Sequence, residues 1–149
     1  MKARRSAFTL VEVLIVVVIM AVLAATIIPQ FSASADDAKL SSLKYNLHTL
    51  RNQLSLYKTQ HDGASPAITS GSLPQLTSFT NKAGTIGKGA NFPYGTYMVG
   101  ALPTNPFNDR NAVVAAGAVP PTAVVGTAGW QYDAATGQIW ANTAGHLAL

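Results

Sequence analysis

The stretch FTLVEVLIVVVIMAVLAATII, residues 8–28, contains a single charged residue, Glu12. A helix of this length extends for roughly 32 Å, which is close to the thickness of the hydrocarbon core of a bilayer. The many β-branched residues would also suit a buried strand, but such strands run for about 4 to 8 residues. The stretch therefore predicts a membrane-spanning helix.

Glu12 is out of place in such a helix, because a carboxylate at the centre of a membrane span costs roughly 2.5 to 3.5 kcal/mol. A charge of this kind needs a positive partner and marks a candidate functional site. In front of the helix lies a leader, residues 1–7, that carries Lys2, Arg4 and Arg5. Basic residues on this side predict a cytoplasmic N-terminus, with the rest of the chain outside the cytoplasmic membrane.

A second helical pattern follows the apolar stretch almost at once. Pro29 lies between the two patterns, and we expect it to kink the helix rather than end it. Apolar residues then recur at steps of three and four, which predicts an amphipathic continuation over residues 29–62 with Gly63 as its stop. The stripe consists of Leu40, Leu43, Leu47, Leu50, Leu54 and Tyr57. A coiled-coil seam is the alternative, but such a stripe more often covers the core of its own domain.

Residues 63–149 predict a small globular domain, because their prolines and glycines exclude long helices. A short helix is expected at Pro74 with Ser72 as its cap. Strands are expected over residues 112–116 and 123–125. The clearest element is a hairpin that joins residues 129–132 to residues 138–141 through the turn 133–137.

The hairpin predicts a small antiparallel sheet that needs cover on one face, and the leucine stripe can supply it. The fold class predicted is therefore α+β, with one long helix packed on a small C-terminal sheet. The residues expected at the helix–sheet contact are Leu43, Leu47, Leu50, Leu54, Tyr57, Trp130 and Trp140.

Composition argues against most other functions. The 149 residues suffice for one ordinary domain, and without cysteine there is no disulfide framework or thiolate metal site. Outside the leader, seven Lys or Arg stand against six Asp or Glu, so nucleic-acid binding is unlikely. His48, His61 and His146 have no partner at ligand spacing and are expected at the surface or as helix caps. We expect no catalytic residues and no cofactor.

A weak calcium site is the one metal alternative that the sequence offers. It would use Asn105, Asn108, Asp109 and backbone carbonyl oxygens. Asn-Pro and Asn-Asp pairs are, however, ordinary turn chemistry. We therefore expect no metal.

The junction RRSAFTLVE, residues 4–12, together with the apolar run and Pro29, resembles the type IV pilin and type II secretion pseudopilin superfamily. The resemblance implies the pilin fold. It also implies that a prepilin peptidase cuts between Ala7 and Phe8 and methylates the new amine of Phe8. The family's glutamate, here Glu12, contacts the N-terminal amine of a neighbouring subunit. Ala7 stands where the family usually has glycine, and because alanine is the smallest alternative we expect cleavage to survive.

The function that this resemblance implies is that of a structural filament subunit, with a major pseudopilin of type II secretion as the first choice and a type IV pilus subunit as the alternative. Its partners would be identical subunits, the prepilin peptidase, the inner-membrane assembly platform and minor pilins or pseudopilins. The C-terminal domain would be periplasmic. A competing interpretation is an exported soluble domain with a signal peptide cleaved after Ala35, because Ala33-Ser34-Ala35 fits a small-x-small site.

Overall fold

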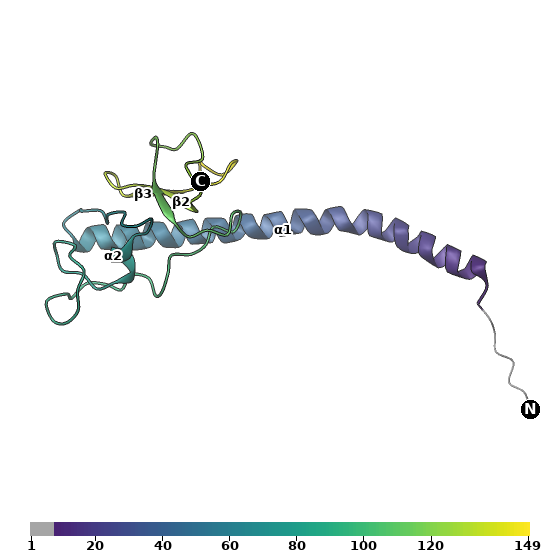
Figure 1. The fold of residues 1–149 in the computed structure, drawn as a ribbon, viewed down its shortest axis with the longest axis horizontal. Helices are drawn as coiled ribbons and strands as arrows, with labels where there is room; N and C mark the ends of the chain where they lie inside the picture. Colours follow the sequence, from purple (N-terminus) through teal and green to yellow (C-terminus); the bar gives the residue numbers. More distant parts are fainter. Residues whose placement is uncertain (1–7) are drawn as a thin grey trace, which may run out of the picture. The chain divides into compact units, whose positions relative to one another are not determined.

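The computed structural model describes residues 8–149, so the predicted leader, with Ala7, lies outside the described residues. Two helices and three strands follow one another along the chain: α1 (Leu10–Gln60), α2 (Pro74–Thr77), β1 (Val113–Ala115), β2 (Trp130–Asp133) and β3 (Gln138–Ala141) (Figure 1). The chain divides into two compact units between Ala38 and Lys39.

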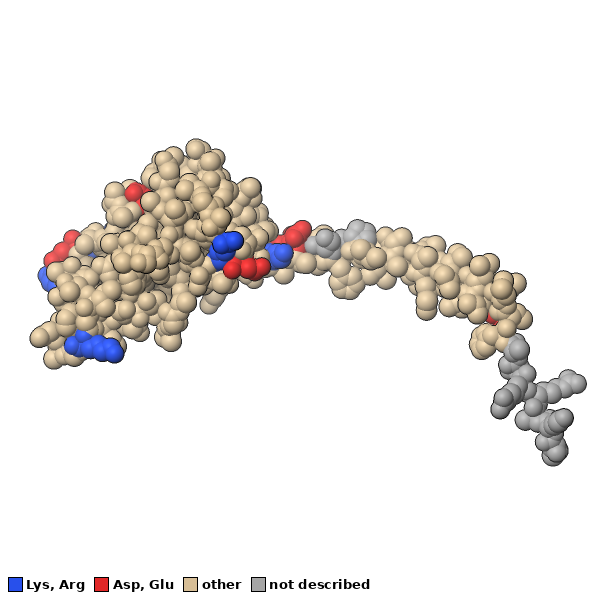
Figure 2. All heavy atoms as spheres, in the orientation of Figure 1, with Lys and Arg blue, Asp and Glu red and all other residues tan. Residues whose placement is uncertain are grey.

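The described part of the first unit is almost entirely helical, and every side chain described in it is exposed. Phe8 is 85% exposed and Phe31 71%. No charged residue lies between Glu12 and Asp36, and Figure 2 draws this stretch without blue or red atoms. By length and composition, α1 is the one helix among the described residues that could cross a membrane.

The second unit has its own hydrophobic core. One face of α1 buries Leu43, Leu47, Leu50, Leu54 and Tyr57, the residues of the predicted stripe apart from half-buried Leu40. The same cluster takes in side chains from α2, from the sheet and from the loops between them: Leu73, Leu76, Tyr97, Leu102, Val113, Trp130, Tyr132, Ile139 and Ala141. A stripe with this spacing therefore packs on its own domain.

α1 ends at Gln60, and Gly63 closes its last turn, as the sequence predicts. The Gly63 N–H donates to the Lys58 carbonyl oxygen at 2.8 Å, and its φ of +83° lies in the left-handed region that favours glycine. The short helix α2 begins at Pro74, but the prediction of Ser72 as its cap was wrong. Leu73 is the N-cap, because a backbone bridge with Thr69 holds Ser72 upstream of the helix.

The three strands form one sheet in the order β1-β2-β3, and the α+β class is confirmed. The sheet is mixed, whereas the sequence analysis expected it to be antiparallel throughout. β2 and β3 form the predicted antiparallel hairpin, with Tyr132 opposite Ile139. β1 pairs parallel to β2, with Val114 opposite Gln131. The 14-residue connection between β1 and β2 explains the difference, because a parallel pair needs a long crossover and a tight turn cannot make one.

The predicted strand over residues 123–125 does not form. The Asn142 side chain occupies both backbone groups of Val125: its Oδ1 accepts the Val125 N–H at 2.9 Å, and its Nδ2 donates to the Val125 carbonyl at 2.7 Å. Gln131 Nε2 likewise donates to the Ala123 carbonyl at 2.7 Å. With these backbone groups bound to side chains, the segment has too few left for a strand ladder.

Candidate processing and assembly site

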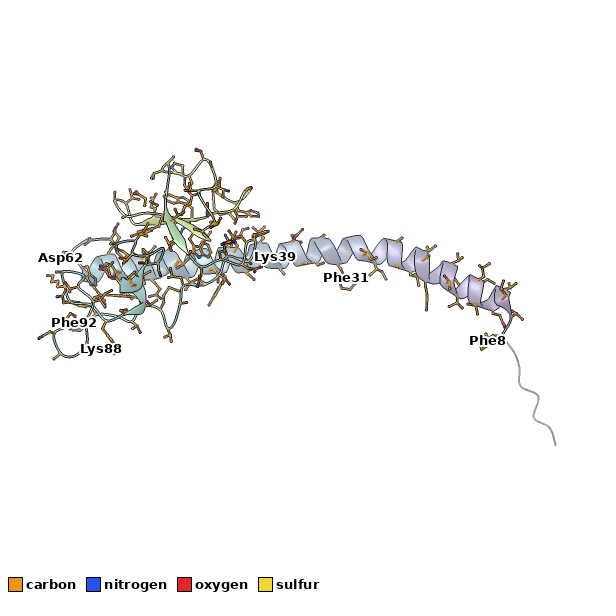
Figure 3. The ribbon with its side chains drawn as sticks, viewed as in Figure 1. Phe8, Phe31, Lys39, Asp62, Lys88 and Phe92 are labelled. Atoms are coloured by element: carbon orange, nitrogen blue, oxygen red, sulfur yellow. The ribbon has the colours of Figure 1, made fainter. Side chains whose placement is uncertain are left out.

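Phe8 and Thr9 precede the first turn of α1. Of the predicted junction, residues 4–12, the structure describes residues 8–12. The Phe8 side chain extends away from the helix and is exposed (Figure 3). Ala7, the other residue of the predicted cleavage site, lies outside the described residues. Cleavage between the two stays a prediction.

Thr9 and Glu12 form a capping box at the start of α1. The Thr9 N–H donates to Glu12 Oε2 at 2.8 Å, and the Glu12 N–H donates to Thr9 Oγ1 at 3.2 Å. The Thr9 hydroxyl also donates to Glu12 Oε2, at 3.0 Å. Each residue thus satisfies a backbone donor that the first helical turn leaves unpaired. The sequence analysis missed Thr9, although T-x-x-E is the sequence signature of this motif.

The capping box uses only one oxygen of the Glu12 carboxylate. Both hydrogen bonds from Thr9 end on Oε2, so Oε1 has no hydrogen-bond partner among the described residues. The bonded N–H of Thr9 is one residue away from the Phe8 nitrogen, which becomes an amine if the chain is cut before Phe8. The carboxylate therefore lies at the same end of α1 as the Phe8 nitrogen of its own chain.

α1 continues as a helix through Pro29. Proline has no N–H, so the carbonyl of Ala25 loses its donor four residues on. Close by, the Thr26 hydroxyl donates to the Leu23 carbonyl at 2.9 Å. The kink that the sequence analysis expected at Pro29 stays a prediction.

Six of the seven residues expected at the helix–sheet contact lie in one core cluster: Leu43, Leu47, Leu50, Leu54, Tyr57 and Trp130. The Trp130 indole N–H donates to the Pro103 carbonyl at 2.8 Å, which satisfies its one polar atom. Trp140 is also buried but lies outside this cluster. Its neighbours Ile139 and Ala141 belong to the cluster, and successive strand residues point to opposite faces.

Among the described residues, Arg51 is one of two charged residues that join α1 to the hairpin; the other is Lys58, whose Nζ donates to the Thr136 carbonyl at 2.8 Å. The Arg51 guanidinium donates to the Ile139 carbonyl from Nε at 3.3 Å and from Nη2 at 3.0 Å, and also to the carbonyl of Leu149. Burial lowers the pKa of Arg51 from its ordinary value.

Burial also raises the pKa of Tyr132, to about 12, and the Tyr132 hydroxyl donates to the Pro66 carbonyl at 3.0 Å.

The three histidines have structural surroundings. His48 is exposed and bonds to Asn52 at 3.1 Å, while His146 is half-buried against the ring of Phe107. His61 is buried and caps the end of α1, with Nδ1 2.8 Å from the Tyr57 carbonyl oxygen and Nε2 3.0 Å from Thr80 Oγ1. The described residues hold no group of three or more His, Cys, Asp or Glu that could bind a metal.

Comparisons with known proteins point in the same direction as the junction. Residues 2–28 match the model of the prokaryotic N-terminal methylation motif. The chain is similar to type II secretion system core protein G of Pseudomonas aeruginosa, with 37% identity over 38% of this chain and 40% of that protein. It is also similar to core protein G of Escherichia coli, with 28% identity over 64% of this chain and 71% of that protein. No solved structure matches the chain.

The methylation motif and the two relatives support the resemblance of the chain to the pilin and pseudopilin superfamily, and the α+β fold is consistent with it. The similarity to the P. aeruginosa protein spans less than half of that protein's length. Among the described residues α1 is the one candidate membrane helix, and together with the methylation motif it gives the chain the features of a single-pass, membrane-anchored protein.

Proposed function

We propose that this chain is a structural subunit of a membrane-anchored helical filament, the major pseudopilin of a type II secretion system. The observation that carries the proposal is a methylation motif attached to an apolar helix whose described side chains are all exposed up to Ala38. An exposed apolar surface of this length needs cover. Lipid covers it in the precursor, and the helices of neighbouring subunits cover it in the filament. The subunit itself performs no chemistry.

Processing begins in the membrane. The prepilin peptidase hydrolyses the peptide bond between Ala7 and Phe8 on the cytoplasmic side, which frees the Phe8 amine. The amine nitrogen then attacks the methyl carbon of a sulfonium methyl donor, which leaves as a neutral thioether while a proton is released, and the protonated methylamine carries a positive charge. The basic leader in front of the helix supports this orientation, with the unit Lys39–Leu149 in the periplasm.

Glu12 acts during assembly. Its Oε1 accepts a charged hydrogen bond from the Phe8 amine of the neighbouring subunit, while its Oε2 keeps the hydrogen bonds from Thr9. In an environment with few water molecules such an attraction is strong, and removal of either partner leaves a buried unpaired charge. The contact thereby sets the axial register of the subunits. The inner-membrane assembly platform and minor pseudopilins are the further partners proposed.

Mass spectrometry of the N-terminus of the mature protein tests the proposal directly. We expect a chain that begins with N-methylated Phe8 when the protein is produced with its prepilin peptidase, and an uncut chain when the peptidase is absent. A mature chain that begins at Asp36 would contradict the proposal and indicate an exported soluble domain. Gene neighbours separate the two kinds of filament, because a secretion ATPase, an outer-membrane secretin and other pseudopilins in one operon indicate secretion, whereas retraction machinery indicates a type IV pilus.

A further inference from the structure

Four carboxamide side chains come together in the second unit, away from the junction. They come from the loop after Pro103, from β2 and from the residue that follows β3. Asn105, Gln131 and Asn142 are buried, and Asn108 is half-buried. Buried polar groups are costly unless they are hydrogen-bonded, so the destination of each donor and acceptor matters.

The two asparagines of the loop use both of their N–H groups. Asn105 Nδ2 donates to the Gly129 carbonyl at 2.9 Å and to Thr143 Oγ1 at 2.7 Å. Asn108 Nδ2 donates to the carbonyls of Ala128 at 3.1 Å and of Asn142 at 3.2 Å. These bonds tie the loop to the segments before β2 and after β3.

Asn142 and Gln131 also donate twice each. Asn142 Nδ2 reaches the carbonyls of Val125 at 2.7 Å and of Ala128 at 2.8 Å. Gln131 Nε2 reaches the Ala123 carbonyl at 2.7 Å and Asn142 Oδ1 at 2.8 Å. The connection between β1 and β2 is thus held to the sheet by side-chain amides in place of strand pairing.

The side-chain oxygens of the three asparagines accept backbone N–H groups. The donors are Phe107 to Asn105 at 3.0 Å, Arg110 to Asn108 at 3.2 Å, and Val125 to Asn142 at 2.9 Å. Gln131 Oε1 is the exception, as the one buried side-chain polar atom without a partner in the described part of the chain.

These bonds do not fit a calcium ion. Calcium takes six to eight oxygen ligands at about 2.3 to 2.6 Å, with carboxylates among them. Here the carbonyl and asparagine oxygens already accept N–H groups, and the amide nitrogens direct positive hydrogens at the carbonyls that a cation would need. Asp109 is exposed and is the single carboxylate of this loop, while Gln131 Oε1 offers only one ligand.

We infer that residues 103–143 form a metal-free structural site in which four carboxamides make the cross-links that a loop cation would otherwise make. The stability of the unit Lys39–Leu149 is accordingly independent of calcium. The hydrogen bonds of this site all lie within the unit Lys39–Leu149, and they do not depend on the proposed filament function.

Thermal unfolding of the full-length wild-type chain in detergent tests the calcium claim without any variant. We expect the same Tm, within about 1 °C, in excess calcium chloride and in excess EDTA. A calcium ion bound at one hundred times its Kd would raise the Tm by roughly 10 °C or more. A calcium-dependent rise of that kind, reversed by EDTA, would overturn the inference.

Asn142→Asp tests the network itself, with Asn111→Asp as the matched control. Asn142→Asp replaces two N–H donors by an oxygen that faces the carbonyls of Val125 and Ala128, so we expect the Tm to fall by roughly 5 °C or more. Asn111 is exposed and its side chain makes no hydrogen bond among the described residues, so the Tm of Asn111→Asp should stay within about 2 °C of wild type. Equal Tm values for the two variants would contradict the structural role of the carboxamides.

Discussion

Glu12 has two roles: it caps the first turn of α1, and in the proposed filament its negative charge binds an amine. One oxygen closes the capping box with Thr9, which is a neutral hydrogen-bonding task that glutamine could also perform. The negative charge is needed only for a cationic partner, and in the proposed filament that partner is the amine of Phe8 on a neighbouring subunit. A substitution that keeps the hydrogen bonds and removes the charge can therefore separate the two roles.

We predict that Glu12→Gln and Glu12→Ala are both cleaved and methylated normally but yield at least tenfold less filament than wild type. An unpaired buried charge costs about 3 to 5 kcal/mol, which is enough to stop the addition of subunits. The yield of sheared filaments, normalised to mature subunit, measures the effect.

Thr9→Ser is the control for these variants, because serine keeps the capping hydroxyl and leaves Glu12 charged. We expect Thr9→Ser to assemble like wild type. If Glu12→Gln also assembles normally, the charge has no role in register and Glu12 serves only as a helix cap.

At the scale of the elements, the parts of α1 in the two units have opposite surroundings. Before Lys39 every described side chain is exposed, whereas from Leu43 onward one face is buried in the core of the second unit. The opposite face of that segment stays exposed, with Tyr45 and Leu56 among its apolar residues. Two leucines of the same helix, Leu50 and Leu56, therefore differ only in the face on which they lie.

We predict that Leu50→Ala lowers the free energy of unfolding of the second unit by about 2 to 5 kcal/mol, because Leu50 is fully buried and its removal leaves a cavity. Leu56→Ala is the matched control on the exposed face and should change stability by about 0.5 kcal/mol or less. Urea denaturation followed by tryptophan fluorescence measures both variants, since Trp130 lies in the same core. Similar losses for the two variants would show that the assignment of the faces is wrong.

At the scale of the whole molecule, the core belongs to one unit. Every residue of the hydrophobic cluster lies between Leu43 and Leu149, so no described side chain of residues 8–38 belongs to it. The first unit has no buried side chain among those described. Its apolar surface is free for lipid or for other copies of the helix.

We predict that a chain which begins at Lys39 remains in solution without detergent and unfolds cooperatively, with a Tm within about 5 °C of the full-length value. The reason is that its core and its carboxamide network are both complete. Circular dichroism and size-exclusion chromatography check this prediction. A fragment without a cooperative transition would mean that the helix before Lys39 is needed for folding.

Short-range patterns were enough to predict much of this architecture. The spacing of Leu43, Leu47 and Leu50 predicts which face of α1 is buried, because a helix has a fixed period. The turn after Asp133 predicts the β2–β3 hairpin, because only a few residues separate its strands. The T-x-x-E spacing of Thr9 and Glu12 likewise indicates their capping box, because both partners lie within one helical turn.

The contacts between distant segments could not be predicted in this way. β1 pairs with β2, and the Asn142 side chain binds the backbone of Val125. Both contacts join residues far apart in the chain, so no local sequence period predicts them. The segment around Val125 has a composition suited to a strand, yet an asparagine 17 residues later binds its backbone. Trp140 was expected at the helix–sheet contact but lies outside the core cluster, whereas its neighbours Ile139 and Ala141 belong to it. A shift of one residue along a strand changes the face of the sheet on which a side chain lies.

The sequence by itself determined the long helix, its apolar and amphipathic parts and the hairpin, because each depends on neighbours within a few residues. Only the tertiary structure decided the parallel pairing of β1, the carboxamide network and the burial of His61. Those features arise when folding brings distant donors and acceptors together, and each buried polar group then has to find its partner within the core.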